Sequence, residues 1–177
     1  MVIACPTQNL INQWKRELKK WGYESNDTLI VKKKWMTEFR RLVNDLNFKI
    51  KIKQKVQIMI TTYDTFNTEE FTKNVKKCER PTMIICDEVH ASGAERTSTG
   101  LLEEYDHRLG LSATPERYFD PDGTNRIMKF FDPIEKCEDC SEHNSIVFSF
   151  ELKDAIPKYL VEYDYFPYYV DLTDDEL

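Results

Sequence analysis

The segment Met83-Ile-Ile-Cys-Asp-Glu-Val-His90 is the most informative part of the sequence about the fold. Four uncharged residues run straight into two adjacent carboxylates, Asp87 and Glu88. A short, continuously apolar run is typical of a strand that is buried on both faces, as in a parallel sheet. Because neighbouring carboxylates repel each other, their place at a strand end indicates that a positive group belongs near them. A solvent-exposed loop start is the plain alternative for an isolated Asp-Glu pair, so the surrounding sequence has to decide.

Comparable apolar runs occur at 2–5, 28–31, 56–60 and 108–111. They alternate with stretches whose apolar residues recur at helical spacing, such as Leu10, Ile11, Trp14, Leu18 and Trp21. Further helices are predicted at 35–47, 63–77, 97–106 and 127–131, and a half-exposed edge strand is predicted at 48–52. Strands that alternate with helices predict an α/β fold, a parallel sheet with helices on both faces.

The chain is predicted to contain three parts. Residues 1–117 carry the strand and helix alternation. Residues 118–145, rich in Pro, Gly and acids, are expected to form a surface excursion. Residues 146–177 are expected to end the domain and begin a connection to a further one. In that last part, six aromatic residues favour a core-covering strand over a base-stacking surface: Tyr159, Tyr163, Tyr165, Phe166, Tyr168 and Tyr169.

Composition narrows the class of protein. The chain has 177 residues, of which 41% are hydrophobic and 32% charged, as in a soluble globular protein. No apolar run approaches the length of a membrane span, and no signal-peptide pattern is present. We therefore expect an intracellular protein that has no membrane partner. It could belong to the cytoplasm, the nucleoid or the nucleus, or be a viral protein in a host cell. Five cysteines are an odd number, which favours reduced thiols over a disulfide framework.

Charge is unevenly distributed along the chain. Residues 1–60 hold 13 Lys and Arg against 5 Asp and Glu, whereas the remainder holds 12 against 26. A basic first third on an acidic protein indicates a local surface for a polyanion, although a solvated lysine-rich face explains the charge equally well. Lys49, Lys51 and Lys53 fall on one face of the predicted edge strand and are candidate contacts to nucleic acid.

Four predicted strands end in unusual residues, and their convergence is stronger evidence for a site than any one motif. The sets are Pro6-Thr7, Thr61-Thr62, Asp87-Glu88 and Ser112-Ala113-Thr114. In α/β sheets, ligands bind beyond the carboxyl ends of the parallel strands, so all four sets are expected on one rim. There an aspartate can hold Mg²⁺, an adjacent glutamate can activate water, and short hydroxyls with helix N-termini can hold phosphates.

Four segments, "ACPTQNLINQW", "TTYDTF", "ICDEVHASGA" and "LGLSATPER", resemble motifs Ia, Ic, II and III of superfamily 2 DEAD/DEAH-box helicases, in that order. The "DEVH" form and the downstream "VFSFELKDAI" to "VDLTDDEL" region resemble the branch that includes the XPB-type DNA repair helicases. The resemblance implies a RecA-like, P-loop NTPase type fold. It also implies nucleic-acid-stimulated ATP hydrolysis, with DNA as the expected partner rather than RNA.

The resemblance also implies residue roles. Asp87 would coordinate the Mg²⁺ of bound ATP, Glu88 would be the catalytic base, and His90 would couple the nucleotide site to a partner domain. Ser112, Ala113 and Thr114 would link hydrolysis to movement. The residues implied to face the nucleic-acid backbone are Pro6, Thr7, Thr61 and Thr62.

One departure from the family is clear. The family's phosphate loop ends in Gly-Lys-Thr or Gly-Lys-Ser, and none of the five glycines here is followed by lysine. The resemblance therefore implies a first motor domain that starts at motif Ia, truncated at its P-loop unit. That unit and a second RecA-like domain would come from elsewhere in cis or in trans. The expected function is a fragment of an ATP-dependent DNA helicase or translocase, inactive alone. The alternatives are a non-enzymatic nucleic-acid-binding or regulatory remnant and one half of a split motor.

A zinc site is weighed at Cys137, Cys140 and His143, which have knuckle-like spacing. Only three ligands are local and no second pair follows, so a plain acidic loop is favoured and zinc is not expected. Mg²⁺ and ATP are the cofactors expected for the intact enzyme.

Overall fold

A computed structural model describes the chain except for residues 25–27, 32–34, 49–55, 133–145, 157 and 171–177. It divides into two compact units, Met1–Asp139 and Cys140–Leu177. Among the described residues, no helix combines the length and the apolar character that crossing a membrane requires.

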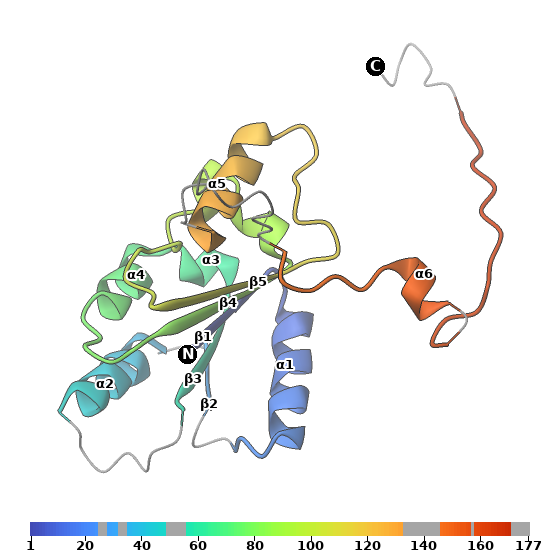
Figure 1. The fold of residues 1–177 in the computed structure, drawn as a ribbon. Coiled ribbons are helices and arrows are strands. Elements are labelled where there is room, and N and C mark those ends of the chain that lie inside the picture. Colours follow the sequence, from blue (N-terminus) through green and yellow to red (C-terminus); the bar gives the residue numbers. More distant parts are fainter. Residues whose placement is uncertain (25–27, 32–34, 49–55, 133–145, 157, 171–177) are drawn as a thin grey trace, which may run out of the picture. The chain divides into compact units, whose positions relative to one another are not determined.

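The first unit is built on a five-stranded sheet in which every pairing is parallel (Figure 1). The strand order is β2-β3-β1-β4-β5. This confirms the predicted α/β fold, and it brings the carboxyl ends of the strands to one edge. The strands are β1 (Val2–Cys5), β2 (Thr28–Ile30), β3 (Ile58–Thr62), β4 (Met83–Asp87) and β5 (His107–Leu111).

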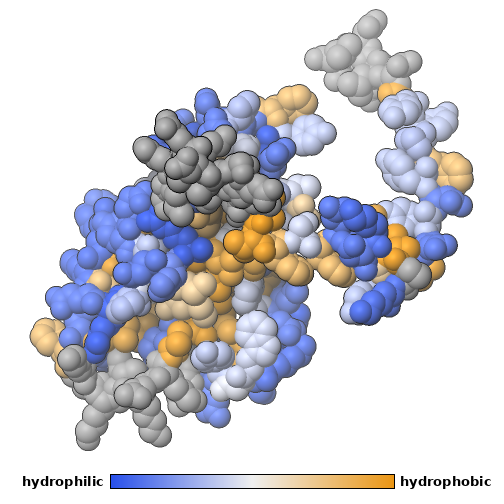
Figure 2. All heavy atoms as spheres, viewed as in Figure 1, coloured by the Kyte–Doolittle hydropathy of each residue, from blue (hydrophilic) through white to orange (hydrophobic). Residues whose placement is uncertain are grey.

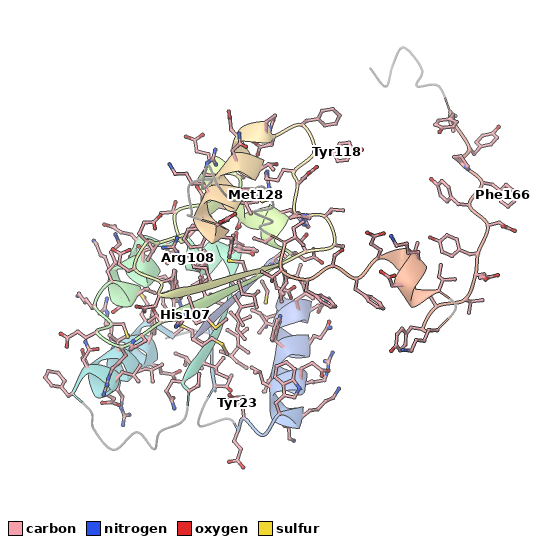
Figure 3. The ribbon with its side chains drawn as sticks, in the orientation of Figure 1. Tyr23, His107, Arg108, Tyr118, Met128 and Phe166 are labelled. Carbon is pink, nitrogen blue, oxygen red and sulfur yellow. The ribbon has the colours of Figure 1, made fainter. Side chains whose placement is uncertain are left out.

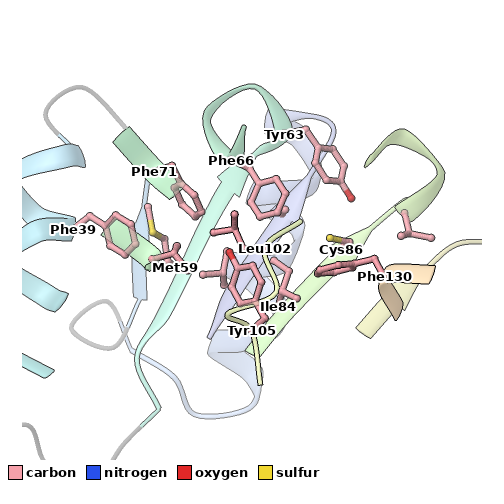
Figure 4. Packing of buried hydrophobic residues seen from close by; sticks show 14 of the residues in the cluster. Phe39, Met59, Tyr63, Phe66, Phe71, Ile84, Cys86, Leu102, Tyr105 and Phe130 are labelled. Atoms are coloured by element: carbon pink, nitrogen blue, oxygen red, sulfur yellow. The ribbon is translucent and has the colours of Figure 1, made fainter. Parts of the chain in front are cut away.

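Helices cover both faces of the sheet, but unequally. Strand alternation directs Ile3 and Ile85 toward Ile11 and Leu18 of α1 (Gln8–Lys20). Among the described helices of the first unit, α1 is the one that packs on this face. The second face carries a larger core with many aromatic rings, among them Phe66 (Figure 4). Its helices are α2 (Trp35–Asn47), α3 (Tyr63–Phe66), α4 (Glu69–Val75) and α5 (Pro121–Phe131).

Hydrophobic residues reach the surface along the free edge of the sheet. Figure 2 shows them between α1, whose outer side is hydrophilic, and the helices of the opposite face. Met83, Leu109 and Leu111 are apolar residues of β4 and β5 that are only half-buried. The face that α1 covers is therefore less completely shielded over β5 than over β1 and β3.

Several predicted elements differ from the structure. β3 begins at Ile58 rather than at residue 56 and continues through Thr62. The predicted helix over 63–77 is two helices, because Thr68 accepts a hydrogen bond from the Phe71 backbone N–H and starts a new one. The predicted short helix at 127–131 begins already at Pro121, capped by Asp120. The predicted edge strand at 48–52 lies outside the described residues, apart from Phe48.

The predicted helix over 97–106 is wrong. This segment is irregular after two short 3₁₀ turns, Val89–Ser92 and Glu95–Thr97. Leu102 and Tyr105 supplied the apolar pattern, and both are buried. Gly100 explains the irregular path, because a Cβ there would lie 2.3 Å from atoms of the Phe66 ring. The chain crosses the core surface as a closely packed loop instead.

The second unit contains one short helix, α6 (Leu152–Ala155), and no strand among its described residues. The six aromatic residues between 159 and 169 are all exposed, as Phe166 illustrates in Figure 3. The predicted core-covering strand is therefore wrong for this segment. Two adjacent aromatic pairs, 165–166 and 168–169, explain the failure, because an extended chain directs neighbouring side chains to opposite sides.

The buried strands make a prediction about cysteine reactivity. Cys5 and Cys86 are fully buried, and burial raises the pKa of each thiol to about 12. At pH 8 we expect both to react with iodoacetamide at least ~100-fold more slowly than the half-buried Cys78, since only the thiolate is nucleophilic. Peptide mass mapping after timed alkylation measures the three rates. Equal rates would contradict the placement of β1 and β4 in the core.

Candidate functional site

The predicted shared rim is confirmed by the strand register. Cys5 pairs with Thr62, and Asp87 pairs with Leu111. The residues that follow these strand ends therefore emerge at the same edge of the sheet. The sets brought together in this way are Pro6-Thr7, Thr62, Asp87-Glu88 and Ser112-Ala113-Thr114.

Asp87 is held by three donors from different parts of the fold. The Trp14 indole Nε1–H donates to its Oδ2 at 2.8 Å. The Glu88 backbone N–H donates to its Oδ1 at 3.1 Å. The Tyr63 hydroxyl donates to its backbone carbonyl at 2.9 Å. Both the carboxylate and the peptide group of Asp87 are thus fixed in direction.

Glu88 adopts a left-handed backbone conformation, with φ of 51° and ψ of 57°. Such a conformation costs a non-glycine residue of order 1–3 kcal/mol, and strain of this kind concentrates at functional sites. Here the turn carries the chain directly from β4 into the 3₁₀ turn that contains His90. The carboxylate consequently lies near the imidazole, with Glu88 Oε2 3.5 Å from His90 Nδ1.

His90 connects the loop after β4 to the loop after β5. Its Nδ1 lies 3.1 Å from Ser112 Oγ, at hydrogen-bonding distance. Ser112 Oγ also accepts a hydrogen bond from the Thr114 backbone N–H at 3.2 Å. Ala113 and Thr114 themselves are exposed. A displacement of either loop would therefore alter the contact that connects it to the other loop.

Two arginines that the sequence reading missed hold the loop after Asp87-Glu88. Arg117 donates through Nη1 to the His90 carbonyl and through Nε to Asp120 Oδ2, the latter at 2.7 Å. Arg126 of α5 donates through Nη1 to the Gly93 carbonyl at 2.6 Å. The only sequence signal for Arg117 is its place directly after Ser112-Ala-Thr-Pro-Glu116.

The start of α5 fits closely against this loop. Asp120 accepts the Gly123 backbone N–H, and this hydrogen bond, with a smaller contribution from Arg117, holds the pKa of Asp120 below its usual value. A Cβ on Gly93 would lie 2.6 Å from the Gly123 carbonyl oxygen and from Ile127 Cδ1. Gly93 is thus required for direct packing of α5 on the site loop.

Two turns at strand ends, called here the Thr7 corner (Pro6-Thr7, before α1) and the Thr62 corner (Thr61-Thr62, before α3), are predicted to face nucleic acid. They differ in exposure. Thr7 is exposed and caps α1, accepting the Leu10 backbone N–H at 3.4 Å. The first turn of α1 contains no acidic residue that would offset its positive dipole end. At the other corner, Thr62 is half-buried, whereas Thr61 is fully buried and donates to the Thr62 carbonyl at 3.2 Å. The structure places the Thr61 side chain in the core, so of these two threonines only Thr62 is partly accessible at the rim.

The donor set at Asp87 and Glu88 suits Mg²⁺ held together with phosphates. In the described part of the chain, no group of three or more His, Cys, Asp or Glu side chains is arranged to hold a metal ion. Mg²⁺ usually keeps several waters and takes one or two protein carboxylates plus substrate phosphates, so the Asp87 carboxylate is sufficient as the protein ligand. Cys137, Cys140 and His143, weighed for zinc, lie outside the described residues, as do Lys49, Lys51 and Lys53.

Comparison with known families gives a match that covers the whole sheet. The family model "Type III restriction enzyme, res subunit" matches residues 1–117, from β1 through the loop after β5. The chain belongs to this family. The type III restriction res subunit family has a helicase-like, superfamily 2 domain of the P-loop NTPase type, so the RecA-like fold inferred from the motifs is confirmed. A comparison with curated proteins finds no match to the chain.

A helicase-like domain of this kind serves ATP-dependent work on nucleic acid, so ATP and nucleic acid are its general partners.

Proposed function

We propose that this chain forms the nucleic-acid-binding and Mg²⁺-binding part of the first motor domain of an ATP-dependent DNA helicase or translocase of the XPB-like branch. The observation that carries the proposal is the common rim. It joins the carboxylates Asp87 and Glu88 to Ser112 through His90, beside the Thr7 and Thr62 corners.

In this proposal, each residue on the rim has a chemical task. Mg²⁺, when bound with ATP, would supply positive charge to stabilise the transferred phosphoryl group. Asp87 orients that ion with a carboxylate whose direction is fixed by Trp14 and the Glu88 N–H. Glu88 accepts a proton from the attacking water. The His90–Ser112 contact then transmits a change at β4 to the loop after β5.

Nucleic acid is proposed to lie across the Pro6-Thr7 and Thr62 corners. Hydroxyls and backbone N–H groups at helix N-termini contact phosphates without reading sequence, as a translocating motor requires. The preference for DNA follows from the resemblance of the "DEVH" segment to the XPB-type helicases. Lys49, Lys51 and Lys53 are proposed to add sequence-independent attraction.

Binding of labelled single-stranded DNA tests this proposal. We expect affinity to fall as salt rises, because phosphate neutralisation releases counterions. Thr7→Glu should weaken binding by about 10-fold or more by placing a negative charge at the start of α1, whereas Thr7→Ser should change it little. Lys73→Glu, a larger charge change on α4, is the matched control.

Simultaneous charge reversal of Lys49, Lys51 and Lys53 should also flatten the salt dependence of DNA binding. If neither salt nor these charge reversals change the affinity for DNA, the three lysines form only a solvated face and do not contact nucleic acid. If the Thr7→Glu variant binds DNA as tightly as the wild type, nucleic acid does not lie at the start of α1.

A second candidate function is a nucleic-acid-binding or regulatory domain without turnover of its own, or one half of a split motor. The observation in its favour is that none of the five glycines is followed by lysine. DNA binding that is unaffected by ATP and Mg²⁺ would favour the first of these. Recovery of ATP hydrolysis on addition of a separate chain carrying the phosphate loop would favour the second.

A further inference from the structure

Both corners proposed to contact nucleic acid are linked to Asp87 by a hydrogen bond. α1 begins after Thr7 and places Trp14 two turns further on, where its indole reaches Asp87 Oδ2. α3 begins after Thr62 and places Tyr63 in its first position, where its hydroxyl reaches the Asp87 carbonyl. Two separate helices thus each send one donor to the same residue.

Trp14 contributes both apolar contact and a hydrogen bond, and packing alone would require only the apolar contact. Trp14 packs with the cluster between α1 and the sheet, and its indole has a single N–H, which is spent on Asp87. A phenylalanine at this position would keep most of the apolar contact and lose the donor. The hydrogen bond also spans 73 residues of sequence, so it joins two elements that share no loop.

The Tyr63 contact is equally specific. Tyr63 is buried, and its hydroxyl donates to the Asp87 carbonyl at 2.9 Å. Because Tyr63 directly follows Thr62, a shift of that corner moves the donor with it.

We propose that Trp14 and Tyr63 are positioning residues that couple nucleic-acid binding at the Thr7 and Thr62 corners to the orientation of Asp87, and so to its affinity for a divalent cation. This rests on the proposed function, because it requires nucleic acid on the rim. A phosphate drawn to the start of α1 shifts the helix as a rigid rod, and the shift reaches Asp87 through the indole. By thermodynamic linkage, the cation changes nucleic-acid affinity by the same factor.

Indole N–H resonances provide a direct probe of this coupling. The chain has three tryptophans, so the ¹H–¹⁵N spectrum contains three indole signals, of which Trp14→Phe identifies one. We expect the Trp14 signal to shift in Asp87→Asn, to broaden first when Mn²⁺ is added, and to shift on addition of short single-stranded DNA. The Trp21 and Trp35 signals are the internal controls.

The coupling itself is measured by titrating Mn²⁺ with and without saturating single-stranded DNA. We expect Mn²⁺ affinity to differ by at least about 5-fold between the two conditions in the wild type. In Trp14→Phe and in Tyr63→Phe, the ratio should fall toward one, while DNA affinity without Mn²⁺ stays within about 2-fold. Chemical denaturation confirms that each variant is folded, and Tyr63→Phe keeps the test valid should Trp14→Phe unfold.

The outcomes separate this inference from the proposed function. If DNA does not bind the wild type, the proposed function fails, and the coupling fails with it. If DNA binds but leaves Mn²⁺ affinity unchanged, the function stands and the coupling is overturned. A coupling ratio that persists in both variants would also overturn the roles of Trp14 and Tyr63.

Discussion

The 177-residue chain is expected to hydrolyse ATP no faster than its Glu88→Gln variant, with or without DNA. Most electrostatic stabilisation in phosphoryl transfer comes from a cradle of backbone N–H groups, a loop lysine and a hydroxyl on Mg²⁺. The chain contains no Gly-Lys pair to supply it. An arginine finger, where one is used, is worth about 10³–10⁵ in rate, and family resemblance places it on a second motor domain.

Steady-state phosphate release, measured with and without single-stranded DNA, tests this expectation. The Glu88→Gln variant is the matched control because it removes the base and keeps the size of the side chain. Nucleotide should also bind weakly, since Asp87 offers one ligand to an ion that retains several waters. Turnover clearly above the control would mean that another group in this chain replaces the loop lysine.

The rim of the site could be predicted from the sequence because it depends on topology alone. Apolar runs that alternate with helices predict parallel strands, and parallel strands bring their ends together. Asp87, Glu88, Ser112 and Thr7 are therefore placed on one rim by the sequence pattern. The same pattern predicts that Thr61 lies beside them, but β3 extends through Thr61, and its side chain falls on a buried face.

The partners of these residues could not be predicted, because they are distant in sequence. Trp14 looked like an ordinary member of an apolar helical stripe, and nothing in its neighbourhood marks its indole as a donor to Asp87. Arg117 and Arg126 reach backbone carbonyls, which every residue possesses and no sequence pattern identifies. Hydrogen bonds to backbone thus carry much of the site geometry while leaving no signal in the chain.

The two failed predictions have different physical causes, although composition and spacing predict a regular element in both segments, 97–106 and 159–169. In 159–169, adjacent aromatic residues cannot share one face of a strand. Leu102 and Tyr105 are buried as expected, but from an irregular loop that Gly100 brings against Phe66. In 97–106, hydrophobicity therefore predicts correctly which side chains are buried. It does not predict the secondary structure, which is set by the close contact between Gly100 and Phe66.

Phe66→Ala is expected to destabilise the first unit by about 3–5 kcal/mol, the usual cost of emptying a fully buried aromatic site. Phe66 is fully buried and its ring lies 5.6 Å from that of Phe71 and 6.0 Å from that of Tyr63 (Figure 4). The loss therefore loosens α3, which carries the donor to Asp87. Phe48→Ala, at an exposed phenylalanine, is the matched control and should stay within about 0.5 kcal/mol of the wild type.

A substitution at Gly100 provides a second test of the packing around Phe66. In the wild type, Gly100→Ala should cost about 1–3 kcal/mol, because its Cβ would lie 2.3 Å from the Phe66 ring. In the Phe66→Ala background, the vacated space admits that methyl group, so the same substitution should cost less by about 1 kcal/mol or more. Urea unfolding of the four chains, followed by fluorescence, measures the cycle. Additive costs would mean that the loop through Gly100 does not rest on Phe66, and the account of why 97–106 is not a helix would lose its basis.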